Sequence, residues 1–177
     1  MIPEKDCSRC SLSAFRTKIV MPDGNLSSTV VFVGEAPGEN EDLTGRPFVG
    51  RSGKLLEKIM NEEGIERKDV MITNTVKCRP PGNRDPTKDE MDACRPFLEY
   101  ELKGRKVIVG LGRSACRDMI GYEGKMADIV NNEMTIEING ANVIFIPAYH
   151  PAACIYSRES KSELKRTMNI LKNKYMV

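Results

Sequence analysis

Short apolar runs that alternate with longer segments of helical periodicity constrain the fold of this chain more than any other feature. The runs at residues 29–33, 70–73 and 107–109 are apolar at nearly every position, as strands are when both faces of a sheet are buried. Segments with apolar residues at helical spacing lie between these runs, one from Ser52 and another from Thr87. This alternation predicts an α/β fold with a mainly parallel sheet.

Helix ends carry local signals in this sequence. Thr87 with Glu90 three residues later is a capping box, which predicts a helix start, and Pro96 predicts a break or kink in that helix. A last helix is expected to start at Ser160, capped by Glu163.

The length and one turn signal complete the prediction of the fold. Asn139-Gly140 between two apolar segments is typical of a β-hairpin. A chain of 177 residues is long enough for one core, so a single domain over residues 1–177 is expected.

Composition excludes several classes of protein. The 27 Lys and Arg nearly balance the 25 Asp and Glu, so net charge alone does not indicate a polyanionic partner. No apolar run approaches the roughly 20 residues of a membrane helix, and the first residues lack the apolar core of a secretory signal. We therefore expect a cytoplasmic protein with no membrane partner.

The six cysteines and the single histidine limit the kinds of metal site that this chain can form. A single His excludes multi-histidine metal sites, and disulfides are not expected outside small secreted scaffolds. Cys7 and Cys10 form a C-x-x-C pair, and with Cys78 and Cys94 they can supply four thiolates to one metal centre. Spacing alone does not choose zinc over an iron–sulfur cluster. The other two cysteines, Cys116 and Cys154, are expected to be buried apolar side chains.

Four unusual loops each follow a predicted strand, at residues 34–38, 74–84, 110–112 and 148–156. Ligands of open α/β sheets bind beyond the carboxyl ends of the strands. We therefore expect a binding site among these four loops, which form the rim of the sheet at that end. A phosphate-binding P-loop is excluded, because Phe48 stands where a Gly is needed and Leu55 where a Ser or Thr is needed.

Several side chains in these loops have both a functional and a structural interpretation. The ring of Phe48 either stacks on a flat ligand or anchors its loop to the core. The amide of Asn74 either hydrogen-bonds the edge of a ligand or caps a turn. His150 lies in a loop before a proline, where a catalytic and a structural role are equally open. Basic residues in or beside the loops are what a phosphate backbone requires; they are Lys77, Arg79, Arg84, Arg113, Arg117 and Arg158.

Taken together, the loops resemble the motifs of family 4 uracil-DNA glycosylases. The similar segments are residues 34–38 with Glu41 and Asp42, 45–53, 74–84 and 149–153, and they agree in order and spacing from Cys7 to about Arg158. The resemblance implies a three-layer α/β/α fold and a 4Fe–4S cluster on the four cysteines Cys7, Cys10, Cys78 and Cys94. It also implies hydrolysis of the bond between uracil and deoxyribose, with DNA as substrate and free uracil as product. A monomer is expected.

The resemblance also implies roles for individual residues. A base must be flipped out of a duplex before its edge is read. Phe48 would then stack on uracil, Asn74 would read its N3 and O4 side, and His150 would hydrogen-bond O2. The backbone of Gly34, Glu35 and Ala36 would line the pocket.

The carboxylate that positions water is not settled by the resemblance, and Glu35 and Glu41 are the two candidates. Asn83 is expected to help hold water or DNA. The predicted DNA contacts are Arg79, Arg84, Ile155, Tyr156 and Arg158, with Ile155 or Tyr156 wedging into the space left by the base.

Two other functions remain open from the sequence. One is a glycosylase of the same fold that acts on another deaminated base. The other is a non-enzymatic nucleic-acid-binding module with structural zinc, which would not require Phe48, Asn74 and His150 together.

Overall fold

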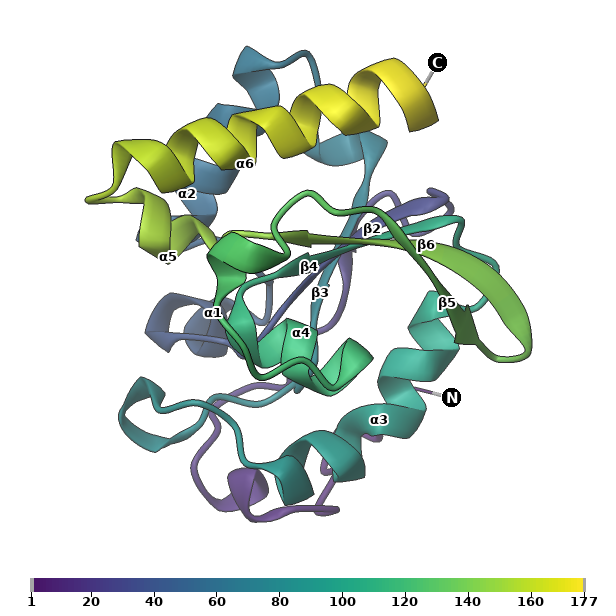
Figure 1. The fold of residues 1–177 in the computed structure, drawn as a ribbon. Coiled ribbons are helices and arrows are strands. Elements are labelled where there is room, and N and C mark those ends of the chain that lie inside the picture. Colours follow the sequence, from purple (N-terminus) through teal and green to yellow (C-terminus); the bar gives the residue numbers. More distant parts are fainter. Residues whose placement is uncertain (1, 177) are drawn as a thin grey trace.

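The computed structural model describes residues 2–176, which form a six-stranded sheet with helices on both faces (Figure 1). The strands are β1 (Asp23–Gly24), β2 (Val30–Gly34), β3 (Met71–Asn74), β4 (Val107–Leu111), β5 (Met134–Ile138) and β6 (Ala141–Ala148). Their order is β1-β3-β2-β4-β6-β5. The four central strands are parallel, and the edge strands β1 and β5 are antiparallel to their neighbours. The predicted mainly parallel sheet is confirmed.

The helices form two layers around this sheet. The α-helices are α1 (Glu39–Thr44), α2 (Arg51–Glu62), α3 (Lys88–Leu102), α4 (Arg113–Ile120), α5 (Pro151–Cys154) and α6 (Arg158–Ile170). Short 3₁₀ turns lie at Ser11–Ala14, Arg67–Asp69, Pro81–Asn83 and Met126–Asp128, and a π-helical turn at Leu171–Tyr175 follows α6. Figure 1 shows α2 and α6 on one side of the sheet and α3 and α4 on the other.

Alternate residues of the central strands supply the two cores. In β2, Val30 and Phe32 pack toward α2 and α6, whereas Val31 and Val33 pack toward α3 and α4. Because both faces are covered, the central strands are apolar at nearly every position, which explains the continuous apolar runs of the sequence. The three-layer α/β/α prediction is therefore confirmed.

Helix boundaries agree with the sequence at α3 and differ at α6. Thr87 caps α3 in a capping box with Glu90, as predicted. Helix α6 begins at Arg158, because the side chain of Ser157 accepts a hydrogen bond from the Ser160 backbone N–H. The predicted start at Ser160 was wrong by one turn.

The glutamate predicted to cap the last helix has another role. Glu163 lies within α6, where its carboxylate accepts a hydrogen bond of 2.9 Å from the side-chain amide of Asn131. A capping box at this position was therefore wrong.

Helix α3 continues through Pro96, so the predicted break was wrong. Pro96 and Asp92 are both exposed, and the carbonyl that loses its helical partner therefore faces solvent. The predicted hairpin is confirmed: Asn139 and Gly140 connect β5 and β6 with φ values of 53° and 77°. No helix within residues 2–176 is long and apolar enough to cross a membrane.

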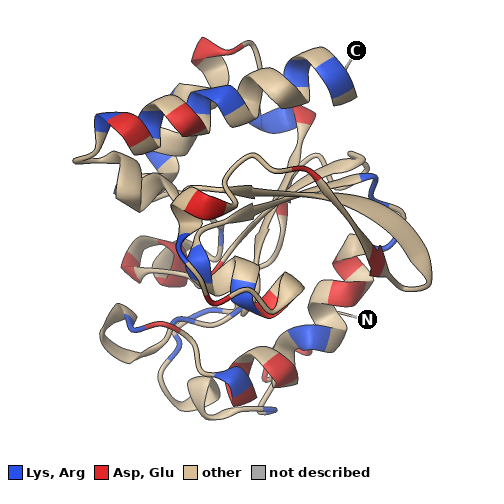
Figure 2. Cartoon of the chain, viewed as in Figure 1, with Lys and Arg blue, Asp and Glu red and all other residues tan. Residues whose placement is uncertain are grey.

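Charged residues of both signs are distributed over the surface of the helices (Figure 2). On α6, acidic residues alternate with the basic ones. Salt bridges use part of this charge, for example between Lys165 and Glu62 at 3.1 Å and between Lys174 and Glu133 at 2.9 Å. The basic C-terminal segment is thus partly neutralised within the chain.

Candidate active site

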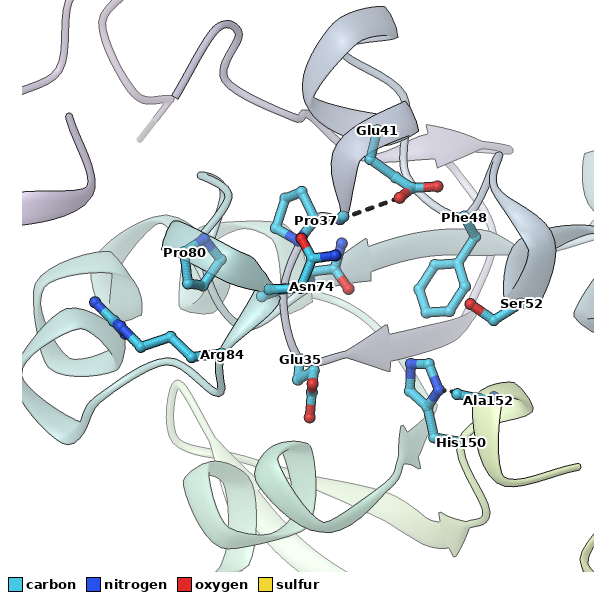
Figure 3. A pocket seen from close by; sticks show the side chains of 13 residues that line it. Glu35, Pro37, Glu41, Phe48, Ser52, Asn74, Pro80, Arg84, His150 and Ala152 are labelled. Atoms are coloured by element: carbon cyan, nitrogen blue, oxygen red, sulfur yellow. Dashed lines mark hydrogen bonds between the residues drawn. The ribbon is translucent and has the colours of Figure 1, made fainter. Parts of the chain in front are cut away.

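A cavity of about 270 Å³ opens at the carboxyl ends of the central strands, where the sequence predicted a site. It brings together residues from four separate segments of the chain, and Figure 3 shows Phe48, Asn74 and His150 around a common space. The predicted site residues that line it are Glu35, Ala36, Glu41, Phe48, Asn74, Asn83, Arg84 and His150.

Gly34 ends β2 and sits where the ring of Phe48 and the amide of Asn74 approach the backbone. A Cβ atom at this position would lie 2.4 Å from Cζ of Phe48 and 2.6 Å from Oδ1 of Asn74. Such distances are far inside van der Waals contact, so only glycine fits without displacing one of the two side chains. Gly34 also pairs with Asn74 in the β2–β3 register.

The backbone of Phe48 is held in an unusual conformation. Its φ of 52° is in the left-handed region that aromatic residues rarely adopt. Arg67 donates from Nη1 to the Phe48 carbonyl at 3.0 Å and from Nη2 to the Pro47 carbonyl. Asp23 in turn accepts from Nε of Arg67 at 3.1 Å. Sequence reasoning missed Arg67, because its partners are backbone atoms that no motif reveals.

Glu41 holds the same loop from its other side. Its Oε2 accepts from the backbone N–H groups of Val49 at 2.8 Å and Gly50 at 2.6 Å, and its Oε1 accepts from Gly38 at 3.0 Å (Figure 3). Both carboxylate oxygens are thus engaged with the chain. Glu41 lines the cavity, but its hydrogen bonds stabilise the loop that carries Phe48.

Glu35 is the other carboxylate at the cavity, and it also borders a second hollow of about 510 Å³. Burial raises the pKa of this carboxyl above its usual 4.5, and the neighbouring Asp85 raises the pKa further. The Ser114 hydroxyl and the guanidinium of Arg117 oppose that shift. A carboxylate with a raised pKa beside a cavity is suited to proton transfer or to orienting water.

Asn74 is the last residue of β3, and 4% of its surface is exposed. Its side chain lines the cavity, and within residues 2–176 its amide has no hydrogen-bond partner. A carboxamide offers one acceptor and two donor hydrogens, so it can read a ligand edge that presents a donor beside an acceptor.

His150 faces Phe48 across the cavity, with ring centroids 5.7 Å apart. Its Nδ1 accepts a hydrogen bond of 3.0 Å from the backbone N–H of Ala152, so the proton of the neutral ring is assigned to Nε2. Desolvation lowers the pKa of His150 to about 4, which keeps the ring neutral near pH 7. Nε2–H is therefore a fixed, uncharged donor.

Other predicted contact residues have partners within the chain. Asn83 accepts from Nε of Arg79 at 2.7 Å, and Arg84 donates to both oxygens of Glu90 at 2.7 and 2.8 Å. That ion pair holds the pKa of Glu90 at about 2. Figure 3 shows the guanidinium of Arg84 pointing away from the cavity.

The predicted wedge residues lie just beyond α5, outside the cavity. Tyr156 is 87% exposed, and the guanidinium of Arg51 lies 5.6 Å from its ring centroid and donates to its hydroxyl at 3.3 Å. Tyr156, Ile155 and Arg158 line a shallow hollow of about 490 Å³ with Arg51. Arg51 was not identified from the sequence as part of this surface.

The four cysteines predicted as ligands gather in one place. Cys78 and Cys94 are buried in a small core cluster, and Cys7 and Cys10 pack against it. Within residues 2–176, no three His, Cys, Asp or Glu side chains converge closely enough to bind a single metal ion. Four gathered, unpaired thiols fit a polynuclear iron–sulfur group, which is wider than one ion and takes an all-cysteine ligand set. The other two cysteines, Cys116 and Cys154, lie in the separate cores on either face of the sheet.

Comparison with known proteins identifies relatives of this chain. A family model described as the uracil DNA glycosylase superfamily matches residues 21–172. A type-4 uracil-DNA glycosylase of Saccharolobus solfataricus is 39% identical over 95% of this chain and 81% of its own length. The type-4 enzyme of Thermotoga maritima is 45% identical over 92% of this chain and 83% of its own length. That of Archaeoglobus fulgidus is 42% identical, with corresponding coverages of 89% and 82%.

Proposed function

The chain belongs to the uracil DNA glycosylase superfamily, with type-4 relatives, and from this premise we propose how its residues excise uracil from DNA. The protein is a uracil-DNA glycosylase that acts in DNA repair. The observation that best supports the roles below is the convergence of Phe48, Asn74 and His150 on one small cavity. We assign these roles to a single domain of residues 1–177 acting as a monomer.

Recognition requires that the base leave the stack and enter the cavity. Phe48 offers an aromatic face for stacking, and Asn74 offers Oδ1 to the N3–H of uracil and Nδ2–H to its O4. Cytosine presents an acceptor at N3 and a donor at its exocyclic amine, so both bonds would be mismatched. A site built on such bonds rejects the wrong base strongly, because its polar groups are left unpaired.

Cleavage of the glycosidic bond places negative charge on the departing base and positive charge on the sugar. Nε2–H of His150 donates to O2 of uracil and stabilises the charge on the base. Glu35 is the carboxylate that we assign to the oxocarbenium-like sugar and to the attacking water, because both oxygens of Glu41 hold the backbone. Asn83 is then left to help orient water or DNA at the rim. Free uracil and an abasic site are the products.

DNA contacts are assigned to the exposed rim. Tyr156 and Ile155 are placed to fill the gap left by the flipped base, and Arg158 to meet the adjacent phosphates. Arg79 and Arg84 lie in the loop after β3. Their pairing with Asn83 and Glu90 would hold this loop in one conformation against the DNA.

We assign a 4Fe–4S cluster to Cys7, Cys10, Cys78 and Cys94. When bound, the cluster supplies a rigid cross-link between the N-terminal segment, the loop after β3 and helix α3. Cys78 lies four residues after Asn74, so this cross-link would fix the segment that reads the base. Arg16 donates to Sγ of Cys78 at 3.7 Å and would balance the negative charge of the thiolates.

The activity is tested with single- and double-stranded oligonucleotides that contain one uracil, followed by alkaline cleavage. We expect strand scission at uracil and none in the same strand with cytosine. Asn74→Ala and His150→Ala should each lower the single-turnover rate by about 10²- to 10³-fold, as loss of a charge-stabilising donor does. No scission of either uracil substrate by the wild-type protein would contradict the proposal, and preferential release of hypoxanthine would identify the alternative glycosylase.

The roles of the two carboxylates are tested by the pH dependence of kcat/KM. The raised pKa of Glu35 means that its carboxylate is lost as pH falls through a value above 4.5, so activity should decline there. His150, with a pKa near 4, should give no break at pH 6.5. Glu35→Gln should remove the acidic decline and lower the rate at neutral pH by about 10²-fold or more.

Glu41→Gln is the matched control for this experiment. It should lower the rate through the loop that carries Phe48 but keep the acidic decline. A decline that disappears in Glu41→Gln and persists in Glu35→Gln would reverse the assignment.

The cluster is tested by colour, since an iron–sulfur protein is brown and a zinc protein is colourless. Cys78→Ser should bleach the visible absorption and lower Tm by more than about 5 °C, because metal binding contributes to folding. Cys116→Ser, at another buried cysteine, should keep the colour. Full activity and stability in a cluster-free Cys78→Ser variant would contradict the supporting role.

A further inference from the structure

A buried ion pair joins the loop after β3 to α3. The side chains of Lys77 and Glu101 are 1% and 7% exposed, and Nζ lies 2.6 Å from Oε1 of Glu101. The expectation that Lys77 meets a phosphate backbone was therefore wrong. Among residues 2–176, Oε2 of Glu101 is buried and has no hydrogen-bond partner. Desolvation of two charges offsets much of their attraction, so a pair of this kind adds little stability compared with apolar residues. Its presence in the core therefore calls for another explanation.

The other hydrogen bonds of Lys77 supply that explanation. Nζ donates at 2.6 Å to Oγ1 of Thr73 and at 2.6 Å to the backbone carbonyl of Asn74. All three ammonium hydrogens thus have acceptors, and one acceptor belongs to the residue whose side chain lines the cavity. Oγ1 of Thr73 also donates to Glu101 at 2.7 Å, which closes the network.

The chain stays beside the end of β2 after Asn74. After Asn74, the backbone N–H groups of Thr75 and Val76 bond to the carbonyls of Gly34 and Glu35. The peptide that follows Asn74 is thus held from both sides: its N–H, that of Thr75, donates to the Gly34 carbonyl at 2.9 Å, and its carbonyl accepts from Nζ of Lys77 at 2.6 Å. Because the backbone of Asn74 sets the direction of its Cα–Cβ bond, holding this peptide also holds the point from which the side chain enters the cavity.

The same residue adjoins the cysteine group. Lys77 directly precedes Cys78, and its backbone N–H faces the thiol of Cys94. Its carbonyl accepts from Val20 at 2.7 Å. Glu101 lies on α3, the helix that carries Cys94. Lys77 thus joins the cysteine group to the backbone of Asn74.

We propose that Lys77 and Glu101 are positioning residues for base recognition, which hold the amide of Asn74 in the orientation that uracil requires. The inference rests on the proposed function, because it concerns how the same pocket reads its base. A charge-assisted hydrogen bond to a carbonyl is stronger and more directional than a neutral one. Misplacement of a recognition group by about 1 Å can cost about 10²-fold in rate.

The test is the double variant Lys77→Met/Glu101→Gln, which removes both charges together and leaves no unpaired ion in the core. Four quantities are measured: Tm, the inhibition constant of free uracil, the affinity for DNA without uracil, and the single-turnover rate of excision. We expect Tm near that of the wild type, a uracil inhibition constant raised about tenfold, and unchanged DNA affinity. The single-turnover rate should fall by about 10- to 100-fold. A stable double variant with a wild-type inhibition constant and rate would overturn the inference.

A pair of single variants provides a matched comparison if the double variant fails to fold. Glu101 and Asp118 are each 7% exposed, and each has one buried oxygen without a partner. Glu101→Gln should raise the uracil inhibition constant about threefold, because the ammonium loses its charged anchor. Asp118 lies on α4, pairs with Arg95 of α3 and is not part of the cavity lining, so Asp118→Asn should leave the inhibition constant unchanged. Equal inhibition constants in the two variants would count against the inference.

Uracil release by the wild-type protein distinguishes a failure of this inference from a failure of the proposed function. A wild type that releases no uracil refutes the function itself. A wild type that releases uracil, with a double variant that binds uracil equally well, refutes only the roles of Lys77 and Glu101.

Discussion

The absence of a side chain at Gly34 is the constraint on which the rest of the site depends. The ring of Phe48 and the amide of Asn74 both occupy the space that a Cβ atom would take. Gly34 lies at the carboxyl end of a central strand and is in register with Asn74, so the sheet itself sets the distance between the two groups. The cavity is therefore shaped by backbone held in a rigid sheet before any ligand arrives.

Charged side chains around the cavity act mainly on backbone atoms. Arg67 binds the carbonyls before and at Phe48, Glu41 binds the amides that follow it, and Lys77 binds the carbonyl of Asn74. These contacts hold Phe48 in its left-handed conformation and leave few polar groups free to meet a ligand. The amide of Asn74, Nε2–H of His150 and the carboxyl of Glu35 are among the polar groups of the cavity lining that can meet a ligand. Preorganised groups of this kind need no rearrangement as charge develops, which is how enzymes stabilise a leaving group.

The sequence predicted the fold well because its strands are buried on both faces, so each apolar run is unmistakable. It also located the rim residues, since four loops follow four parallel strands. The predictions failed at residues whose role depends on contacts that appear only in the folded chain. Ser157 and Ser160 are both good caps by residue type, and only the fold shows that Ser157 is the one that caps α6. Pro96 is tolerated because its helix face is exposed. Arg67 and the pairing of Lys77 with Glu101 were missed as positioning residues, because they act on distant backbone atoms and buried partners.

The most direct test of this account is the uracil-excision rate of Gly34→Ala under single-turnover conditions, with Tm measured on the same sample. The added methyl group must displace Phe48 or Asn74, so we expect the rate to fall by about 10²-fold or more while the protein stays folded. A folded Gly34→Ala variant that excises uracil at the wild-type rate would contradict the claim that the close approach of these two side chains forms the recognition site.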